Sequence, residues 1–95
     1  MSMILRIDHP VPDYVRWKAA FDADPIGRDR MGVRRHRIMR PVDDAGRVMI
    51  DLEFDSADKA DRMLGELRTL WSRVEGTIMT SPEARVVEEL ETATY

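Results

Sequence analysis

Two spacings of hydrophobic residues stand out along the chain. Apolar and polar residues alternate between Val48 and Phe54, so that every second side chain falls on the same face of an extended strand. Between Ala57 and Val74 apolar residues recur at steps of three and four, which is the pattern of a helix with one apolar face. These segments are the clearest strand and the clearest helix of the sequence.

Shorter patterns predict the other elements. Apolar and β-branched residues after Met3 favour a strand, and Pro10 and Pro12 interrupt it because each removes a backbone donor. An aromatic stripe that contains Trp17 and Phe21 should bury one helix against a sheet. The expected elements are strand Met3–Asp8, helix Pro12 to Asp22 or Ala23, strand Val33–Val42, hairpin loop Asp43–Gly46, strand Val48–Phe54, helix from Asp55 or Ser56 with a stop at Gly76, loop Thr77–Glu83, and strand Ala84 to Leu90 or Glu91.

The order of these elements predicts an α+β fold of the ferredoxin-like βαββαβ type. In that arrangement two helices cover one face of a four-stranded antiparallel sheet, with the first and third strands in the centre and the second and fourth at the edges. If the apolar side of 48–54 meets the helices, Asp51 and Glu53 lie on the uncovered face. Beside them we expect either the set with Arg6 and Asp8 or the alternate residues of the first strand.

Composition limits the classes of function. The 95 residues suit one domain over 1–95, and so small a core favours oligomerisation. Fifteen Lys and Arg against eighteen Asp and Glu give a net charge of −3, which disfavours binding to nucleic acid or to an anionic membrane. The absence of cysteine excludes a disulfide framework, a thiolate metal site and a cysteine nucleophile. Without a membrane-spanning or targeting segment, we expect a cytoplasmic protein.

One group of charged residues is a candidate for chemistry. Arg6, Asp51 and Glu53 come from strands predicted to be neighbours, so their side chains can meet on the uncovered face. A carboxylate there is expected to have a raised pKa and to abstract a proton from a phenolic or enolic substrate. A structural ion pair, within one subunit or between two, explains the same residues.

Two histidines and one arginine complete the candidates. His36 lies among arginines that include Arg34, and positive charge nearby favours a neutral ring that can act as a general base. A solvated basic edge strand that resists edge-to-edge aggregation also explains this run, and edge strands commonly use charge in this way. His9 ends the first strand, where it can contact a ligand at a cavity mouth or cap a turn. The catalytic candidates are therefore His36 and Asp51, and the ligand-binding candidates are Arg6, His9, Arg34 and Glu53, with Arg6 or Arg34 stabilising an oxyanion.

Several chemistries have no motif in this sequence. There is no glycine-rich phosphate loop, no His-Glu-x-x-His, no nucleophile elbow and no cluster of cysteine and histidine. Two histidines separated by a helix do not make a metal site without convergent carboxylates. We therefore predict neither a metal ion nor another cofactor.

Three segments resemble a known group of proteins. The residues from His9 to Asp22, from Gly32 to Arg35 and from Arg47 to Phe54 resemble small proteins of the dimeric α+β barrel superfamily. The resemblance covers nearly the whole chain. It is closest to the antibiotic-biosynthesis-monooxygenase-like group and weaker to small aromatic polyketide cyclases.

This resemblance implies a homodimer in which two ferredoxin-like sheets form a barrel around a small ligand. The haem-degrading relatives need an axial histidine on a helix, and neither predicted helix contains one. The expected function is thus a cofactor-independent monooxygenase-like or cyclase-like enzyme that acts on an aromatic or polyketide-like compound.

Two other functions stay open. In one, the chain is a noncatalytic ligand-binding or dimeric scaffold domain, and its charges are intersubunit pairs. In the other, it joins a larger partner through its basic edge strand. A pocket that encloses Asp51 or His36 would favour an enzyme, and a fully packed barrel would favour a scaffold.

Overall fold

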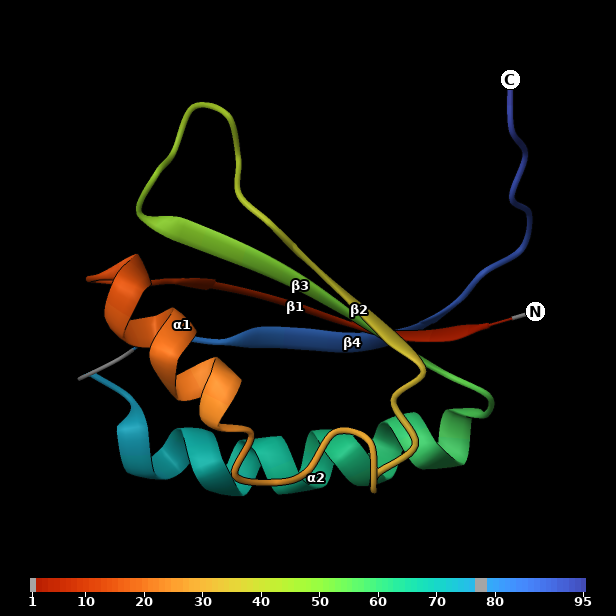
Figure 1. Ribbon diagram of the computed structural model, residues 1–95, viewed down its shortest axis with the longest axis horizontal. Coiled ribbons are helices and arrows are strands. Elements are labelled where there is room, and N and C mark those ends of the chain that lie inside the picture. The colour runs from red at the N-terminus through yellow and green to blue at the C-terminus, as the bar shows by residue number, and fades with distance from the viewer. Residues whose placement is uncertain (1, 77–78) are drawn as a thin grey trace.

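A four-stranded antiparallel sheet carries both helices on one face, as Figure 1 shows. The computed structural model describes residues 2–76 and 79–95. The strand order β2-β3-β1-β4 confirms the predicted ferredoxin-like arrangement. The elements are β1 (Met3–Pro10), α1 (Tyr14–Ala23), β2 (Arg35–Met39), β3 (Arg47–Phe54), α2 (Ala57–Val74) and β4 (Glu83–Glu88).

Both helices begin at a capping side chain. Asp13 has an extended backbone, and its carboxylate accepts hydrogen bonds from the backbone N–H groups of Val15 and Arg16 at 3.0 and 3.3 Å. Helix α1 therefore begins at Tyr14, two residues after the predicted Pro12. Ser56 caps α2 in the same way.

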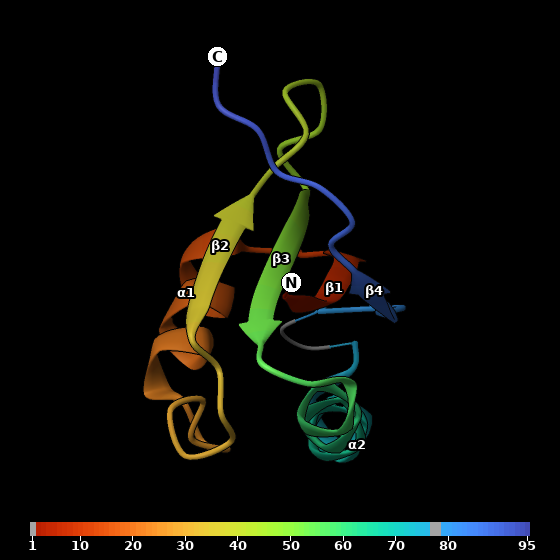
Figure 2. The same ribbon diagram turned by 90° about the vertical axis from the view of Figure 1, so that its right-hand side faces the viewer.

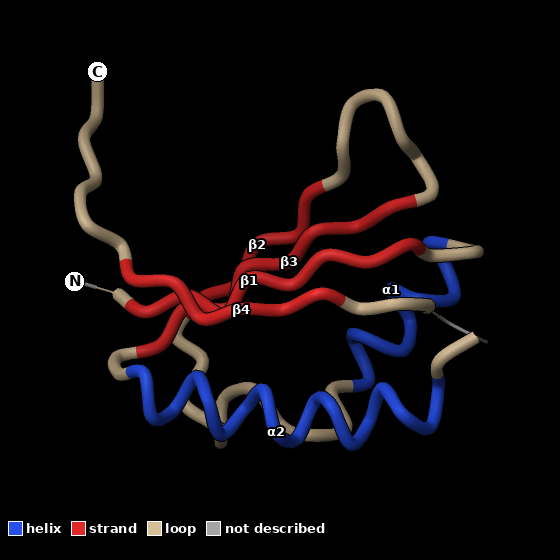
Figure 3. Tube along the Cα trace, turned by 180° about the vertical axis from the view of Figure 1, so that it is seen from behind, coloured by secondary structure: helices blue, strands red, loops and turns tan. Residues whose placement is uncertain are grey.

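The edge strand β2 is shorter than the predicted 33–42. Arg34 still donates its backbone N–H to the carbonyl of Glu53, but Pro41 has no N–H to continue the ladder. The chain then leaves the sheet in a loop that projects away from α2, as the C-terminal segment also does (Figure 3). In contrast, β1 runs two residues further than predicted, because Pro10 still pairs with Arg47.

The last strand also differs slightly from its prediction. Strand β4 runs over Glu83–Glu88 and ends before Leu90, and it pairs with β1 along its whole length. The predicted loop Thr77–Glu83 lies in part outside the described residues. No helix within 2–76 and 79–95 is long and apolar enough to cross a membrane.

The core lies between the sheet and the helices. Alternation along β1 and β3 directs Leu5, Ile7, Ile50 and Leu52 to the helices, and each is at most 4% exposed. Helix α2 packs on β1, β3 and β4, whereas α1 lies on the side of β2 (Figure 2). No helix among residues 2–76 and 79–95 covers the opposite face of the sheet, which is called the open face below.

Candidate functional site

A cavity of about 130 Å³ lies between the covered face of the sheet and the two helices. Most of its wall is apolar, and three of its described lining residues have titratable side chains. An apolar cavity with a few polar groups is the usual form of a small-molecule site. The titratable residues are His9, Asp24 and Arg28, and the apolar wall includes Ile7, Trp17, Phe21, Leu52, Met63 and Trp71.

His9 extends into this cavity from the end of β1. Its Nδ1 lies 3.0 Å from the carbonyl oxygen of Pro10. A carbonyl only accepts, so Nδ1 carries the ring proton and Nε2 is left as an acceptor. No hydrogen-bond partner of Nε2 lies among the described residues. Burial, the largest influence, lowers the pKa of His9 below 6.5, so the ring is neutral at physiological pH. A neutral imidazole with a free nitrogen can accept a proton.

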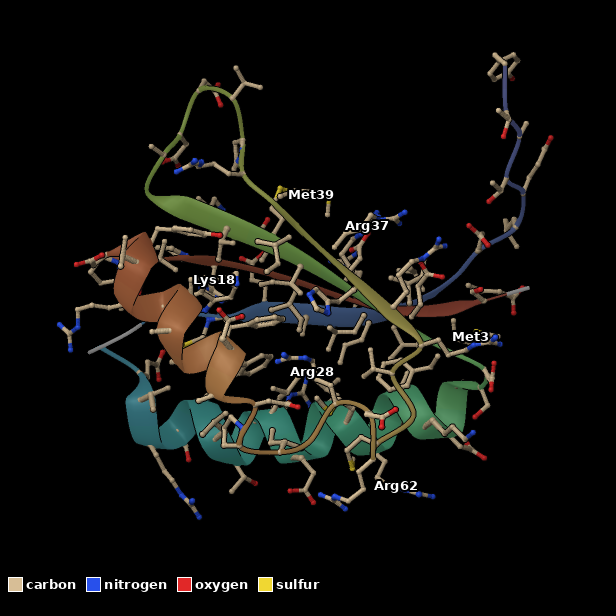
Figure 4. All side chains as sticks on the ribbon, in the orientation of Figure 1. Met3, Lys18, Arg28, Arg37, Met39 and Arg62 are labelled. Atoms are coloured by element: carbon tan, nitrogen blue, oxygen red, sulfur yellow. The ribbon has the colours of Figure 1, made fainter. Side chains whose placement is uncertain are left out.

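Asp24 and Arg28 come from the segment that follows α1. Asp24 ends the helix with a left-handed backbone (φ 50°), and its carboxylate accepts the backbone N–H of Arg28 at 2.9 Å. The Arg28 side chain turns back and donates from Nη1 to the carbonyl oxygen of Phe21 at 2.8 Å. Nη1 also lies 3.5 Å from the Asp24 carboxylate. Figure 4 shows Arg28 on the α2 side of the sheet.

Aromatic rings connect these two polar regions along α1. The His9 ring lies 5.8 Å from Trp17, and Trp17 stacks on Phe21 with centroids 5.1 Å apart. The Arg28 guanidinium covers Phe21, 3.9 Å from the ring centroid. The wall therefore has a proton acceptor at one end, a hydrogen-bond donor at the other and flat apolar surface between. This arrangement can hold a flat ring compound with polar groups at its edge.

On the open face lie the three charged residues that the sequence predicted to meet, Arg6, Asp51 and Glu53. Arg6 binds Asp51 through two hydrogen bonds of 2.9 and 2.8 Å, and Arg35 binds Glu53 at 2.8 and 3.1 Å. Arg37 lies 3.6 Å from the Asp51 carboxylate, and Figure 4 shows it on the side of the sheet away from α2. These contacts form an ion-pair network.

This network reverses the expected protonation behaviour of Asp51. Hydrogen bonds from Arg6 hold the pKa of Asp51 below its ordinary 3.8, although burial acts in the opposite direction. The expectation of a raised pKa at Asp51 is wrong, because the arginines stabilise the charged carboxylate more than its burial disfavours it. A carboxylate held in this state is a weak proton acceptor.

The other predicted residues lie outside the cavity. His36 is on the covered side of β2 but exposed, and its ring centroid lies 5.1 Å from that of Phe21, with the two rings edge to face. Arg34 pairs with Asp55 at 2.6 Å, and both side chains are exposed. Of the six candidate residues, only His9 is among the described residues that line the cavity. The roles assigned to the other candidates stay predictions.

Sequence reasoning missed Asp24 and Arg28. Both lie in a stretch with proline and glycine that reads as a loop, so no periodic pattern marked their direction. Their spacing of four residues was the available signal, because Asp24 and Arg28 form an i,i+4 ion pair.

Solved structures share this architecture. SnoaB, a cofactor-independent oxygenase from Streptomyces nogalater, matches with a TM-score of 0.73 and 16% identity over 96% of this chain and 95% of that chain. A Nitrosomonas europaea protein assigned as an antibiotic biosynthesis monooxygenase matches at 0.69 and 15% identity, over 94% and 90%. A dimeric ferredoxin-like protein from an uncultured marine organism matches at 0.62 and 11% identity, over 97% and 98%.

This chain has the ferredoxin-like fold of those proteins. The resemblance in fold to the antibiotic-biosynthesis-monooxygenase-like group is therefore confirmed. Identities this low show a shared fold and leave the chemistry to the residues of the site. No protein-family model matches the chain, and no curated protein sequence matches it.

Proposed function

We propose that this chain is a homodimeric enzyme that binds a small aromatic compound in the cavity and oxygenates it without a metal or flavin. The observation that carries the proposal is His9, a neutral and buried residue that lines an apolar cavity and whose Nε2 has no hydrogen-bond partner among the described residues. SnoaB, which shares the fold, is a cofactor-independent oxygenase.

The reaction class follows from what the site supplies. His9 accepts a proton from a phenolic or enolic substrate, and the resulting anion is electron-rich enough to react with dioxygen. The keto tautomer of such a substrate has a ring CH₂ group, for which the balance is R₂CH₂ + O₂ → R₂C=O + H₂O, so dioxygen is the only oxidant. The N–H groups of Arg28 donate to a second, uncharged oxygen of the substrate and so orient its ring toward His9.

The size of the cavity favours the smaller of the expected ligands. An engineered protein cavity of about 150 Å³ holds one benzene molecule. The present cavity, at about 130 Å³, is therefore of a size for a single ring. A polyketide-like compound with several fused rings would extend beyond it.

The two histidines offer a matched test of catalysis. Oxygen uptake with a panel of small hydroquinones, measured above the spontaneous rate, compares His9→Gln with His36→Ala. We expect His9→Gln to lower the rate by about 100-fold or more, because it removes the general base. We expect His36→Ala to keep the rate within about twofold, since its ring lies outside the cavity. Loss of activity in His36→Ala alone would place the base on β2.

The noncatalytic alternative has its own result in the same experiment. Quenching of Trp17 and Trp71, which both line the cavity, reports ligand binding separately from turnover. Ligands that bind with no oxygen uptake across the panel would support a binding protein in place of an enzyme.

The homodimer in this proposal is supported by the open face. This face buries Ile4 and Asp51 without a covering helix, and one matching structure is a dimeric ferredoxin-like protein. Sedimentation should give a dimer, and Met39→Glu should weaken it because Met39 lies on the open face. Val15→Glu is the matched control, since Val15 is an exposed apolar residue on α1. A monomeric wild-type protein would contradict this part of the proposal.

A further inference from the structure

The cavity has one cation and one anion among its described lining residues. These are Arg28 and Asp24, which lie four residues apart and form an ion pair. His9 is the third titratable group and is neutral at physiological pH. The side chains around a bound ligand therefore sum to no net charge.

Arg28 is fixed in position but keeps hydrogen-bonding capacity. Its Nη1 is held by the carbonyl oxygen of Phe21, and its plane covers the Phe21 ring. The Arg28 side chain is only 19% exposed. Its Nε and Nη2 have no hydrogen-bond partner in the described part of the chain. These atoms can donate to an oxygen of a ligand that lies on the aromatic wall.

Asp24 decides which kind of oxygen suits this donor. The Asp24 carboxylate lies 3.5 Å from Nη1, so the charge of Arg28 is already balanced. A ligand carboxylate at Arg28 would lose its hydration and meet a second carboxylate nearby. A carbonyl or amide oxygen accepts the same hydrogen bonds with no such repulsion.

We infer that the cavity selects an uncharged ring compound with a hydroxyl group at His9 and a neutral oxygen acceptor at Arg28. Asp24 is the residue that sets this preference against carboxylates. The inference rests on the proposed function, because it takes the cavity as the ligand site.

Two probes that differ in one group test this preference. 4-Hydroxybenzamide and 4-hydroxybenzoate have the same ring and hydroxyl group, but at neutral pH only the second carries a carboxylate charge. Quenching of tryptophan fluorescence gives their dissociation constants. We expect wild-type protein to bind the amide at least about 10-fold more tightly than the carboxylate.

Asp24→Asn changes the charge and preserves the local structure. Asparagine tolerates the left-handed backbone at this position, and its side-chain oxygen can still accept the Arg28 N–H. The variant should shift the ratio of the two dissociation constants at least about 10-fold toward the carboxylate. Asp24→Gly, which also tolerates this backbone, gives the same test without a side chain.

Asp22→Asn is the matched control. It removes a carboxylate from the same helix, but Asp22 is exposed and pairs with Lys18 away from the cavity lining. The ratio of the two dissociation constants should stay as in the wild type. An equal shift in Asp22→Asn would show a general effect of net charge and overturn the role of Asp24.

The remaining outcomes separate the two proposals. Equal binding of both probes to wild-type protein, or an unchanged ratio in Asp24→Asn and Asp24→Gly, overturns the selectivity and leaves the cavity as a ligand site. Absence of quenching by both probes in every variant overturns the selectivity together with the proposed function.

Discussion

The two faces of the sheet differ in how their polar groups are used. On the open face, the carboxylates of Asp8, Asp51 and Glu53 each bind an arginine from another strand. On the covered face, His9 leaves one ring nitrogen without a partner among the described residues, and Arg28 leaves several N–H groups. The open face has many more charges, but the covered face has the hydrogen-bonding capacity that a ligand can use.

This contrast shows why charge alone is a poor guide to a ligand site. Charged side chains on a sheet without a covering helix must be paired or hydrated, and pairing keeps the carboxylates ionised. A polar atom that lines an apolar cavity and has no partner within the protein can bind a ligand without breaking an existing hydrogen bond of the protein. His9 fits the second description and Asp51 the first.

Leu52 and Asp51 are neighbours on β3 that face opposite sides of the sheet, so substitutions at the two residues compare the two faces directly. The largest expected loss of stability is at Leu52. Leu52 faces the cavity and is 2% exposed, so Leu52→Ala should lower the free energy of unfolding by about 2–4 kcal/mol. Urea denaturation measures this loss. A smaller loss than that of Asp51→Asn would mean that the open face contributes more to stability than the core.

Asp51→Asn tests the open face and has a specific pH dependence. It removes the charge that binds Arg6, and we expect a loss of about 1–3 kcal/mol at neutral pH. The folded pKa of Asp51 is depressed, so its stabilisation is present above pH 3.8 and is lost as the pH falls through the folded pKa. Acid denaturation should therefore be less steep in Asp51→Asn. The control Asp22→Asn, at an exposed pair, should keep the wild-type steepness.

The smallest expected effect is a pH dependence of the free energy of unfolding, which comes from His9 on the covered face. Because its folded pKa is below 6.5, the unfolded chain binds more protons as the pH falls below that value. The free energy of unfolding should then decrease, by about 1 kcal/mol down to a pH of about 5. His9→Gln should remove this decrease and His36→Ala should retain it. A decrease that instead follows His36 would contradict the buried, neutral state of His9.

The spacing of apolar residues predicted the elements well, because each element that packs on the covered face buries one side and leaves the other side polar. Strand β3 and helix α2 each have one apolar side, and both were predicted within a few residues. Strand β2 was less well bounded, since arginines occur on both of its faces. Its register with β3 places His36 on the covered side and Arg35 on the open face.

The site was predicted less completely than the fold. His9 was a candidate because a strand end can place a side chain at a cavity mouth. Asp24 and Arg28 reach the cavity through a left-handed backbone residue and a hydrogen bond back to Phe21. Neither feature has a periodic signature in the sequence, so their positions depend on tertiary structure.

The central position of β1 has a consequence for synthesis on the ribosome. Met3 pairs with Phe54 on one side and with Glu88 on the other, so one edge of β1 stays unpaired until β4 has been translated. During that interval one edge of β1 exposes unpaired N–H and C=O groups, to which a strand of another chain can pair, so the nascent chain is prone to aggregation until β4 is added. The last step of folding is then the addition of β4 beside the strand that was made first.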